Sequence, residues 1–453
     1  MTTLAAPARS VAPSATKTAR YARSFAHQQR AHRVIPGGAH TYAKGDDQMP
    51  EAAPLVIARG QGCRVWDLDG HAYIEYGMGL RAVTLGHAEP RVTAVAVQAM
   101  QGGTNFTRPA AIELEAAERF LGLIEGADMV KFCKDGSNAT TAAVKLARAA
   151  TGRAKVAVCA HHPFLSQDDW FIGTTPTDAG IPDAIKDLTV RFPYGDAVAL
   201  EVLFALHPGE IAAVVLEPVR GAEDAGPYLR DVQRRCREHG AVLVFDEMIT
   251  GFRWDLRGAQ HLYGVTPDLS TFGKALANGF SVSALAGRRD LMERGGLRTE
   301  QERVFLLSAT HGAETHALAA AVETMRIYET EDVVETLHRQ GARLREGVEQ
   351  QIDALGLHEQ FVVVGRDCNL VFATRDAEGQ ASQAFRTLFL QELLLHGILA
   401  PSFVVSAAHD NEAIDQTVEA VGKALVVYRR ALESGIERFL HGRPVKPVFR
   451  KHC

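Results

Sequence analysis

Residues 241–254 read AVLVFDEMITGFRW, an apolar run that ends in two acidic residues, Asp246 and Glu247. The apolar residues are continuous rather than alternating, which predicts a strand buried on both faces, as in a parallel sheet covered by helices. Asp246 then stands at the carboxyl end of that strand, where open α/β sheets bind ligands. The alternative is that Asp246 caps the next turn or pairs with Arg253, and this stretch alone does not decide.

The sequence on either side repeats the pattern of short apolar strand and amphipathic helix. Strands are predicted at MVKFC (129–133), KVAVCA (155–160) and IAAVVLEPV (211–219), and helices at ATTAAVKLARAAT (139–151) and LRDVQRRCREHG (229–240). This alternation predicts an α/β fold with a mainly parallel sheet in a large domain. After about residue 320 long helical periodicity dominates and short strands return, which predicts a smaller α+β domain.

The expected domain organisation follows these changes of pattern. Residues 1–20 contain no acidic residue and are rich in Ala, Ser, Thr and Arg, which favours a disordered tail over a transit peptide. Residues 21–60 should form the N-terminal part of the small domain. Residues 61–335 should form the large domain, and residues 336–453 the C-terminal small domain.

Composition excludes several classes of function. A formal net charge of −5 gives no basic surface for nucleic acid or an anionic membrane. No apolar run reaches the roughly 18 residues that a membrane helix needs. The six cysteines are scattered without a CxxC pair, which argues for a reducing compartment and against a metal site. We therefore expect a cytoplasmic protein without a bound metal.

The stretch VKFCKDGSNATTAAVKLARAATGR (130–153) carries a predicted strand through a polar turn directly into a helix. Unpaired backbone N–H groups and the helix dipole make such a helix start an anion site. Gly136 allows close approach of a ligand, Ser137 adds a hydroxyl donor, and Asn138 follows in the first turn. The alternative is a plain helix cap, because Ser and Asn are common there.

Lys274 lies in DLSTFGKALANGF (268–280), just after another predicted strand. A lysine in such a setting can form a Schiff base with an aldehyde, and its amine can then move protons. Taken alone, Lys274 could equally be a surface lysine. A phosphate cradle, a carboxylate for a pyridinium nitrogen (Asp246) and an imine-forming lysine are together what pyridoxal 5′-phosphate (PLP) requires.

The sequence resembles the class III (subgroup II) aminotransferases in four stretches, VVLEPV (214–219), VFDEMITGFR (244–253), AQHLYGVTPDLSTFGKALANG (259–279) and THGAETHALAAA (310–321). Within that family it resembles the glutamate-1-semialdehyde 2,1-aminomutase branch through VIPGGAH (34–40), VWDLDGHAYIEYGMGLRAVTLGH (65–87) and AAVKLARAATGRAKVAV (142–158). The resemblance covers roughly residues 30–430. It implies the PLP-dependent transferase fold type I and a homodimer with active sites at the subunit interface.

The resemblance also assigns roles to single residues. Lys274 and Asp246 keep the roles given above. His161 falls where the family has an aromatic residue stacked on the cofactor ring, and Glu217 matches the glutamate near the substrate side of the cofactor. Thr310 is expected to reach the phosphate of the partner subunit, with Ala309 as the alternative register.

The sequence departs from the aminomutase pattern in segments that recognise the substrate. Lys44, in HTYAKGD (40–46), stands where the aminomutase has a carboxylate-binding arginine, and GLRAV (79–83) brings Arg81 near the expected pocket. The PSFVVS segment (401–406) is shortened. Arg81 then either anchors a carboxylate or hydroxyl of the substrate or is a structural arginine.

These departures predict an aminotransferase acting on an amino acid donor and a polar carbonyl acceptor. The stretches GGAHTYAKGDDQ (37–48) and GLRAVTLGH (79–87) resemble enzymes of secondary-metabolite and polysaccharide biosynthesis. This resemblance implies a keto-sugar or a cyclic polyhydroxy keto acid, such as a dehydroshikimate-like compound, as the acceptor. A glutamate-1-semialdehyde 2,1-aminomutase is the first alternative. A non-catalytic protein with the same fold is the second, and it would not need both Lys274 and Asp246.

Overall fold

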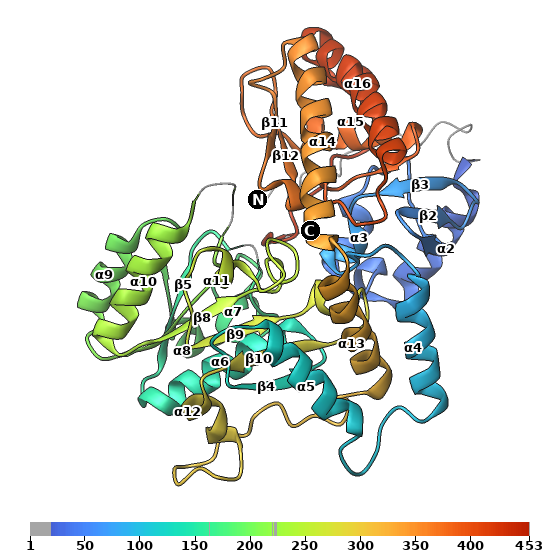
Figure 1. The fold of residues 1–453 in the computed structure, drawn as a ribbon. Helices are drawn as coiled ribbons and strands as arrows, with labels where there is room; N and C mark the ends of the chain where they lie inside the picture. The colour runs from blue at the N-terminus through green and yellow to red at the C-terminus, as the bar shows by residue number, and fades with distance from the viewer. Residues whose placement is uncertain (1–19, 163, 220, 222–223, 453) are drawn as a thin grey trace.

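The computed structural model describes residues 20–162, 164–219, 221 and 224–452. The expected tail of residues 1–20 falls outside this description except for Arg20. Figure 1 shows two parts, one built around the strands β4 to β10 and the other carrying the long helices α14 (Val333–Leu355) and α16 (Asn411–Ser434). The predicted domain boundaries remain predictions.

A seven-stranded sheet forms the centre of the larger part. Its strands lie in the order β4 (Met129–Cys133), β10 (Ser283–Gly287), β9 (Leu269–Phe272), β8 (Val242–Asp246), β7 (Ile211–Leu216), β5 (Lys155–Cys159) and β6 (Thr189–Phe192). Strand β10 pairs antiparallel with β4 and β9, and the other neighbours pair parallel. The predicted α/β fold with a mainly parallel sheet is confirmed.

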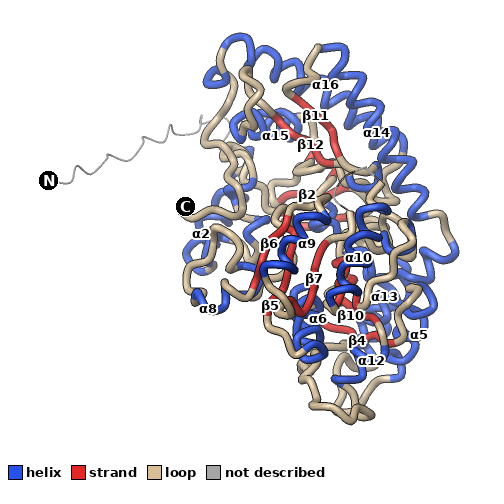
Figure 2. Tube along the Cα trace, turned by 90° about the vertical axis from the view of Figure 1, so that its left-hand side faces the viewer, coloured by secondary structure: helices blue, strands red, loops and turns tan. Residues whose placement is uncertain are grey.

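Helices cover both faces of this sheet, as Figure 2 shows. Every residue of β7 is buried, which explains its continuous apolar sequence. Ala213 and Val215 pack in the core that includes α6 (Gly136–Thr151), whereas Val214 and Leu216 pack in the core that includes α10 (Gly226–His239). The other helices of this part are α4 (Pro90–Gln101), α5 (Ala111–Leu123), α7 (Asp169–Ile172), α8 (Asp183–Lys186), α9 (Ala197–Leu206), α11 (Ala259–Leu262), α12 (Arg289–Met292) and α13 (Thr315–Thr330).

The second part combines segments from both ends of the chain. Strands β1 (Ile57–Gln61), β2 (Arg64–Asp67), β3 (Ala72–Glu75) and β13 (Ile398–Leu399) form one sheet, and β11 (Phe361–Val364) pairs with β12 (Val371–Thr374). Strand β13 runs parallel to β3, which joins the C-terminal segment to the region before the large sheet. Helices α2 (Ala22–Val34), α14, α15 (Gln383–Leu395) and α16 complete this part, with α3 (Met78–Arg81) following β3.

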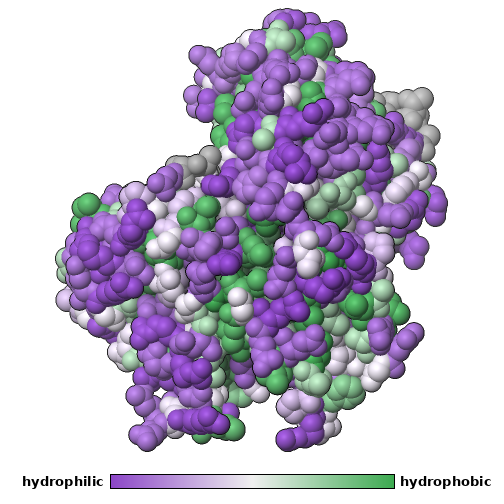
Figure 3. All heavy atoms as spheres, viewed as in Figure 1, coloured by the Kyte–Doolittle hydropathy of each residue, from purple (hydrophilic) through white to green (hydrophobic). Residues whose placement is uncertain are grey.

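The surface hydropathy, the helix lengths and the grouping of metal-binding side chains bear on what membranes and metal ions require of a protein. On the face drawn in Figure 3, hydrophilic residues cover most of the region over α14 and α16, and hydrophobic residues show in scattered patches over the larger part. Among the described helices, none is long and apolar enough to cross a bilayer. In the same part of the chain, no group of three His, Cys, Asp or Glu side chains is arranged to hold a metal ion.

Candidate active site

Lys274 lies at the carboxyl edge of the large sheet, where β9 ends. It opens the short helix η4 (Lys274–Ala277) in a left-handed conformation, with φ of 44°. A Cβ on the preceding residue, Gly273, would lie 2.5 Å from Ser283 Oγ and 2.7 Å from Met248 Sδ, so close packing requires glycine there. Lys274 as a whole residue is partly exposed, and burial is the largest influence on its amine.

Burial lowers the pKa of Lys274 below its ordinary value. The negative charges of Asp246 and Glu217 oppose this shift, and the positive charges of Arg81 and Arg253 add to it. A lysine with a lowered pKa has a larger neutral, nucleophilic fraction at neutral pH. All four charged groups therefore lie within electrostatic reach of the Lys274 amine.

Asp246 is the last residue of β8 and is only 3% exposed. Its Oδ1 accepts hydrogen bonds from the Met248 backbone N–H (3.0 Å) and the Thr271 hydroxyl (3.3 Å). Burial, followed by the charge of Glu217, raises the pKa of Asp246 to about 7. A carboxylate in this place needs a cation to stabilise it, which a protonated pyridine nitrogen would supply.

Glu247, the second acid of the opening stretch, has a different role. It is 0% exposed and accepts hydrogen bonds from the backbone N–H groups of Ala259 (2.9 Å) and Gln260 (2.7 Å) and from the Thr250 hydroxyl. These contacts satisfy free N–H groups at the start of α11. Burial raises the pKa of Glu247 to about 7 as well. Of the two adjacent acids, Asp246 therefore lies near Lys274, and Glu247 stabilises the start of α11.

The start of α6 has the features of a phosphate cradle. The Asp135 side chain caps the helix by accepting the Asn138 N–H at 2.9 Å, and the Ser137 hydroxyl accepts the Gln167 N–H at 3.0 Å. The backbone N–H groups of Gly136 and Ser137 donate to no other described residue. The capping residue is therefore Asp135, whereas Ser137 and Asn138 lie inside the helix. The two backbone donors of Gly136 and Ser137 remain for an anion at the positive end of the helix.

Glu217 follows β7, and a histidine contacts it from the end of β5. The Glu217 backbone N–H donates to His162 Nε2 at 3.2 Å, and His162 Nδ1 lies 3.6 Å from Glu217 Oε1. Because Nε2 accepts, the neutral His162 ring carries its proton on Nδ1. The neighbouring His161 is exposed, and its predicted stacking on the cofactor ring remains a prediction. Sequence reasoning chose one residue of the His161–His162 pair and missed the other.

Arg81 ends α3, a helix whose backbone is mostly left-handed. Positive φ values occur at Met78 (43°), Leu80 (59°) and Arg81 (72°), conformations that L residues rarely adopt. The Arg81 guanidinium donates from Nε to Asn369 Oδ1 at 2.8 Å. Burial first, and then the charge of Arg253, lower the pKa of Arg81 to about 10, against the opposite effect of Glu217.

Arg253 supports this segment from behind. It is 0% exposed, and its Nη2 donates to the Arg81 carbonyl (2.8 Å) and the Thr84 hydroxyl (3.2 Å). Both side-chain hydrogen bonds of Arg253 to described residues thus go to the segment that carries Arg81. The described residues include no hydrogen bond or ion pair between Arg253 and Asp246. The predicted alternative in which these two residues pair is therefore wrong.

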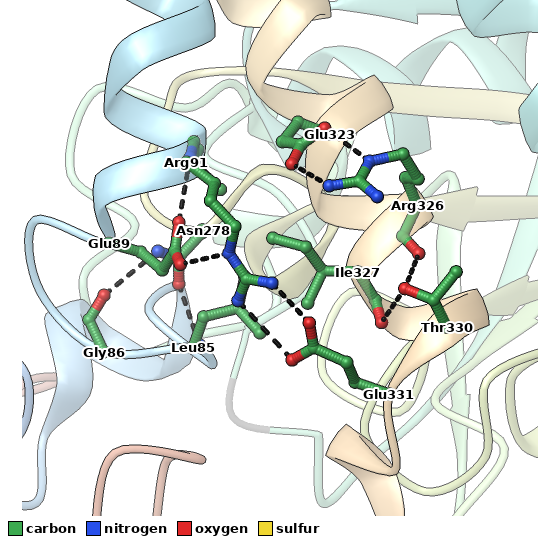
Figure 4. Close-up of polar contacts among 11 residues, drawn as sticks. Leu85, Gly86, Glu89, Arg91, Asn278, Glu323, Arg326, Ile327, Thr330 and Glu331 are labelled. Atoms are coloured by element: carbon green, nitrogen blue, oxygen red, sulfur yellow. Dashed lines mark hydrogen bonds and ion pairs between the residues drawn. The ribbon is translucent and has the colours of Figure 1, made fainter.

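Asn278 ties the segment after Lys274 to the loop after Arg81. Its Oδ1 accepts the backbone N–H groups of Thr84 (3.0 Å) and Leu85 (2.9 Å), and its Nδ2 donates to the Gly86 carbonyl at 3.0 Å. Figure 4 shows Asn278 beside Leu85 and Gly86, near Arg91, which bonds to Glu89 and to Glu331, the C-terminal cap of α13. The backbone positions of Lys274 and Arg81 are thereby coupled.

Lys44 and Thr310 lie on the surface of the single chain. Lys44 is exposed on the short helix η2 (Tyr42–Lys44), and Thr310 is exposed in the loop before α13, where its carbonyl accepts from Asn105 Nδ2 at 2.9 Å. Among the described residues, no hydrogen bond or ion pair joins Lys44 or Thr310 to the group around Lys274. Their roles at a neighbouring subunit's site remain predictions.

The residues at the sheet edge fit PLP. The start of α6 would hold the phosphate, Asp246 would hold the proton on the pyridine nitrogen, and Lys274 would bind the aldehyde carbon and move protons. Bound PLP supplies an electron sink for the carbon next to the reacting amine. Asp246 and Lys274 are close enough to perturb each other's pKa, as these two roles require.

Comparison with known proteins gives the same family. The aminotransferase class-III family model matches residues 42–421. Glutamate-1-semialdehyde 2,1-aminomutase from Roseiflexus castenholzii is 34% identical, with 89% of this chain and 97% of the relative covered. The same-named protein from Dichelobacter nodosus is 32% identical, covering 86% and 96% respectively.

Solved structures agree with this assignment. The FumI protein of Sphingopyxis sp. MTA144, in a PLP-bound form, has a TM-score of 0.83 and 31% identity, covering 94% of this chain and 99% of that one. An omega-transaminase from Sphaerobacter thermophilus has a TM-score of 0.80 and 26% identity, covering 90% and 98%. The chain belongs to the class III aminotransferases and is a PLP-dependent enzyme of fold type I.

Proposed function

We propose that this enzyme transfers an amino group from an amino acid, such as glutamate or glutamine, to a polar carbonyl compound. The proposed acceptor is a keto-sugar or a cyclic polyhydroxy keto acid, such as a dehydroshikimate-like compound, in secondary-metabolite or polysaccharide biosynthesis. The observation that carries the proposal is the guanidinium of Arg81 within electrostatic reach of Lys274 and Glu217. A guanidinium recognises carboxylates and hydroxyl groups as a donor of several hydrogen bonds.

Lys44 supports the same proposal from the substrate side. The aminomutase pattern places an arginine at the position of Lys44, and an ammonium group cannot reproduce a bidentate guanidinium–carboxylate pair. We infer that the carboxylate-binding role has moved to Arg81, which approaches the reacting groups from α3 instead of from the N-terminal segment. The substrate would then be held in a different orientation from that of the aminomutase.

The second candidate is the aminomutase itself. Its support is the 32% and 34% identity to relatives named glutamate-1-semialdehyde 2,1-aminomutase over most of the chain. An aminomutase moves the amino group within one substrate and needs no separate acceptor. The loss of arginine at position 44 counts against this candidate.

The proposal includes a cytoplasmic homodimer with active sites at the subunit interface. The exposed positions of Lys44 and Thr310 support it, because exposed residues of one chain can serve the site of a neighbour. Thr310 would donate to the PLP phosphate of the partner subunit, and Lys44 would approach its substrate. Small-molecule donor and acceptor are the only other partners proposed.

An absorbance titration tests the proposed function. The PLP-loaded protein is mixed with single amino acids in the absence of acceptor, and we expect glutamate or glutamine to convert the PLP spectrum to that of the aminated cofactor. Addition of a cyclic polyhydroxy keto acid should restore the original spectrum, whereas pyruvate should restore it more slowly. A spectrum restored equally well by simple keto acids would count against the proposed acceptor class.

A further inference from the structure

Asn369 is the one described side chain that bonds to the guanidinium of Arg81. It belongs to the short helix η6 (Asp367–Asn369), which lies far from Arg81 in sequence, and its Oδ1 accepts from Arg81 Nε at 2.8 Å. Both side chains are partly exposed. The contact therefore links the second part of the molecule to the segment that carries the proposed substrate-binding arginine.

This hydrogen bond fixes which way the Asn369 amide points. A guanidinium has only donors, so the atom facing Arg81 Nε must be the amide oxygen. The Nδ2 group, with its two donors, then points elsewhere. It donates to no described residue, and Asn369 itself is partly exposed.

The same bond leaves one edge of the Arg81 guanidinium unused. Carboxylates can pair with a guanidinium through Nε and one Nη or through both Nη atoms, and Asn369 occupies Nε. Neither Nη1 nor Nη2 donates to another described residue. A substrate carboxylate must therefore approach Arg81 end-on, through both Nη atoms.

Hydrogen bonds from other segments fix the backbone of Arg81 and so help to keep its two Nη atoms pointing in one direction. Arg253 donates to the Arg81 carbonyl at 2.8 Å, and Asn278 accepts the N–H groups of Thr84 and Leu85 just beyond it. The left-handed conformation at Arg81 costs free energy and persists because these contacts stabilise it. Arg81 is thus restrained both at its backbone carbonyl and at the Nε atom of its guanidinium.

We propose that Asn369 determines substrate specificity together with Arg81, which presents two Nη donors for a carboxylate while Asn369 Nδ2 presents a donor for an adjacent hydroxyl. This inference rests on the proposed function and narrows it: the acceptor carries a carboxylate with a hydroxyl on the same or the next carbon. An unhydroxylated acid leaves Nδ2 without a substrate partner. A neutral polyol leaves the Arg81 charge unpaired.

Calorimetric titration of the PLP-loaded protein tests this with three ring compounds. Quinate carries a carboxylate and hydroxyls, cyclohexanecarboxylate only the carboxylate, and myo-inositol only hydroxyls. We expect wild type to bind quinate about 10-fold more tightly than cyclohexanecarboxylate, the effect of one good hydrogen bond. Myo-inositol should bind most weakly.

Two substitutions separate the two functions of Asn369. Asn369→Ala removes the hydroxyl donor, so quinate should fall to the affinity of cyclohexanecarboxylate. Asn369→Asp keeps the acceptor for Arg81 Nε but places a negative charge beside the guanidinium, so both acids should lose about 10-fold or more in affinity. The PLP spectrum should be unchanged in both, and Gln416→Ala, on the exposed face of α16, serves as the control.

Two results would overturn the inference in distinguishable ways. If Asn369→Ala binds quinate as tightly as wild type does, Asn369 has no role in specificity, while the proposed function survives. If wild type binds quinate no better than cyclohexanecarboxylate, the paired donors and the proposed class of acceptor fail together.

Discussion

The carboxyl edge of the large sheet and the segment Met78–Arg81 both contribute charged groups near Lys274, but they are built differently. At the sheet edge, the positions of Asp246 and Lys274 follow from parallel β8 and β9, which pair with each other. At Met78–Arg81, a left-handed backbone depends on side chains from distant segments, namely Arg253 and Asn278. The first region is set by regular structure and the second by a few individual contacts.

The buried strands at the sheet edge and the segment Met78–Arg81 should tolerate substitution to different degrees. Changing a strand of the sheet edge disturbs the buried core, as the fully buried β7 and β8 show. Changing Arg81 itself alters a partly exposed side chain outside the strands and leaves the strands intact. Cofactor chemistry should therefore be kept while substrate specificity changes, and substitutions in the two regions should affect different kinetic quantities.

The largest effect is expected at the sheet edge, from Lys274→Ala. Turnover should fall by at least about 10⁴-fold, because the amine that binds PLP and moves protons is lost. PLP can still be held by the start of α6 and by Asp246. Steady-state assays measure the loss, with Lys423→Ala on the exposed face of α16 as control. Borohydride reduction and peptide mapping of wild type should find the cofactor on Lys274, and a label on another lysine would refute the assignment.

Asp246→Asn should lower kcat on the order of 10³-fold, since a neutral amide cannot hold the ring nitrogen protonated. The matched variant Glu247→Gln removes the adjacent carboxylate, which accepts three hydrogen bonds in the fold. It should retain kcat and lose about 1–3 kcal/mol of unfolding free energy. Single-turnover kinetics and urea denaturation measure the two effects. Near-normal turnover by Asp246→Asn would mean that Asp246 only caps the turn at Met248 and does not act on the cofactor.

In the segment of Arg81, Arg81→Ala should raise the KM for the acceptor about 10- to 100-fold, and the KM for the donor much less. The kcat should change little, because the sheet edge is untouched. Arg343→Ala on the exposed face of α14 serves as a control for loss of an arginine. Equal increases in both KM values would indicate a structural role for Arg81.

The smallest expected effect is a pH-dependent change in the thermal stability of the protein freed of PLP. The pKa of Asp246 rises from 3.8 in the unfolded chain to about 7 in the fold, so the folded state binds the proton more tightly. This contribution to stability is present below about pH 4 and is lost as the pH rises to about 7. Asp246→Asn should therefore raise the Tm of the cofactor-free protein at pH 8 by a few degrees relative to wild type, and change it little at pH 4. Equal Tm differences at both pH values would contradict the assigned pKa.

The sequence predicted the sheet edge because strand ends are local features. Asp246 and Lys274 each follow an apolar run, and parallel strands bring such ends together. The contacts of Arg81 were not predicted, since Asn369 lies 288 residues away and no local pattern marks it. The structural role of Glu247 depends on α11, which follows an irregular loop. Lys44, Thr310 and His161 remain predictions because the single chain does not test them.

We propose that the cofactor-binding edge of the sheet is kept while recognition of the substrate carboxylate has moved from position 44 to Arg81. The most direct measurement compares kcat/KM of the PLP-loaded wild type in two reactions, conversion of glutamate 1-semialdehyde to 5-aminolevulinate, and amino transfer from glutamate to a cyclic polyhydroxy keto acid. We predict that the transfer reaction is faster by at least about 100-fold, because the Lys44 ammonium cannot replace a bidentate guanidinium. Efficient formation of 5-aminolevulinate, with little or no transfer, would contradict the account.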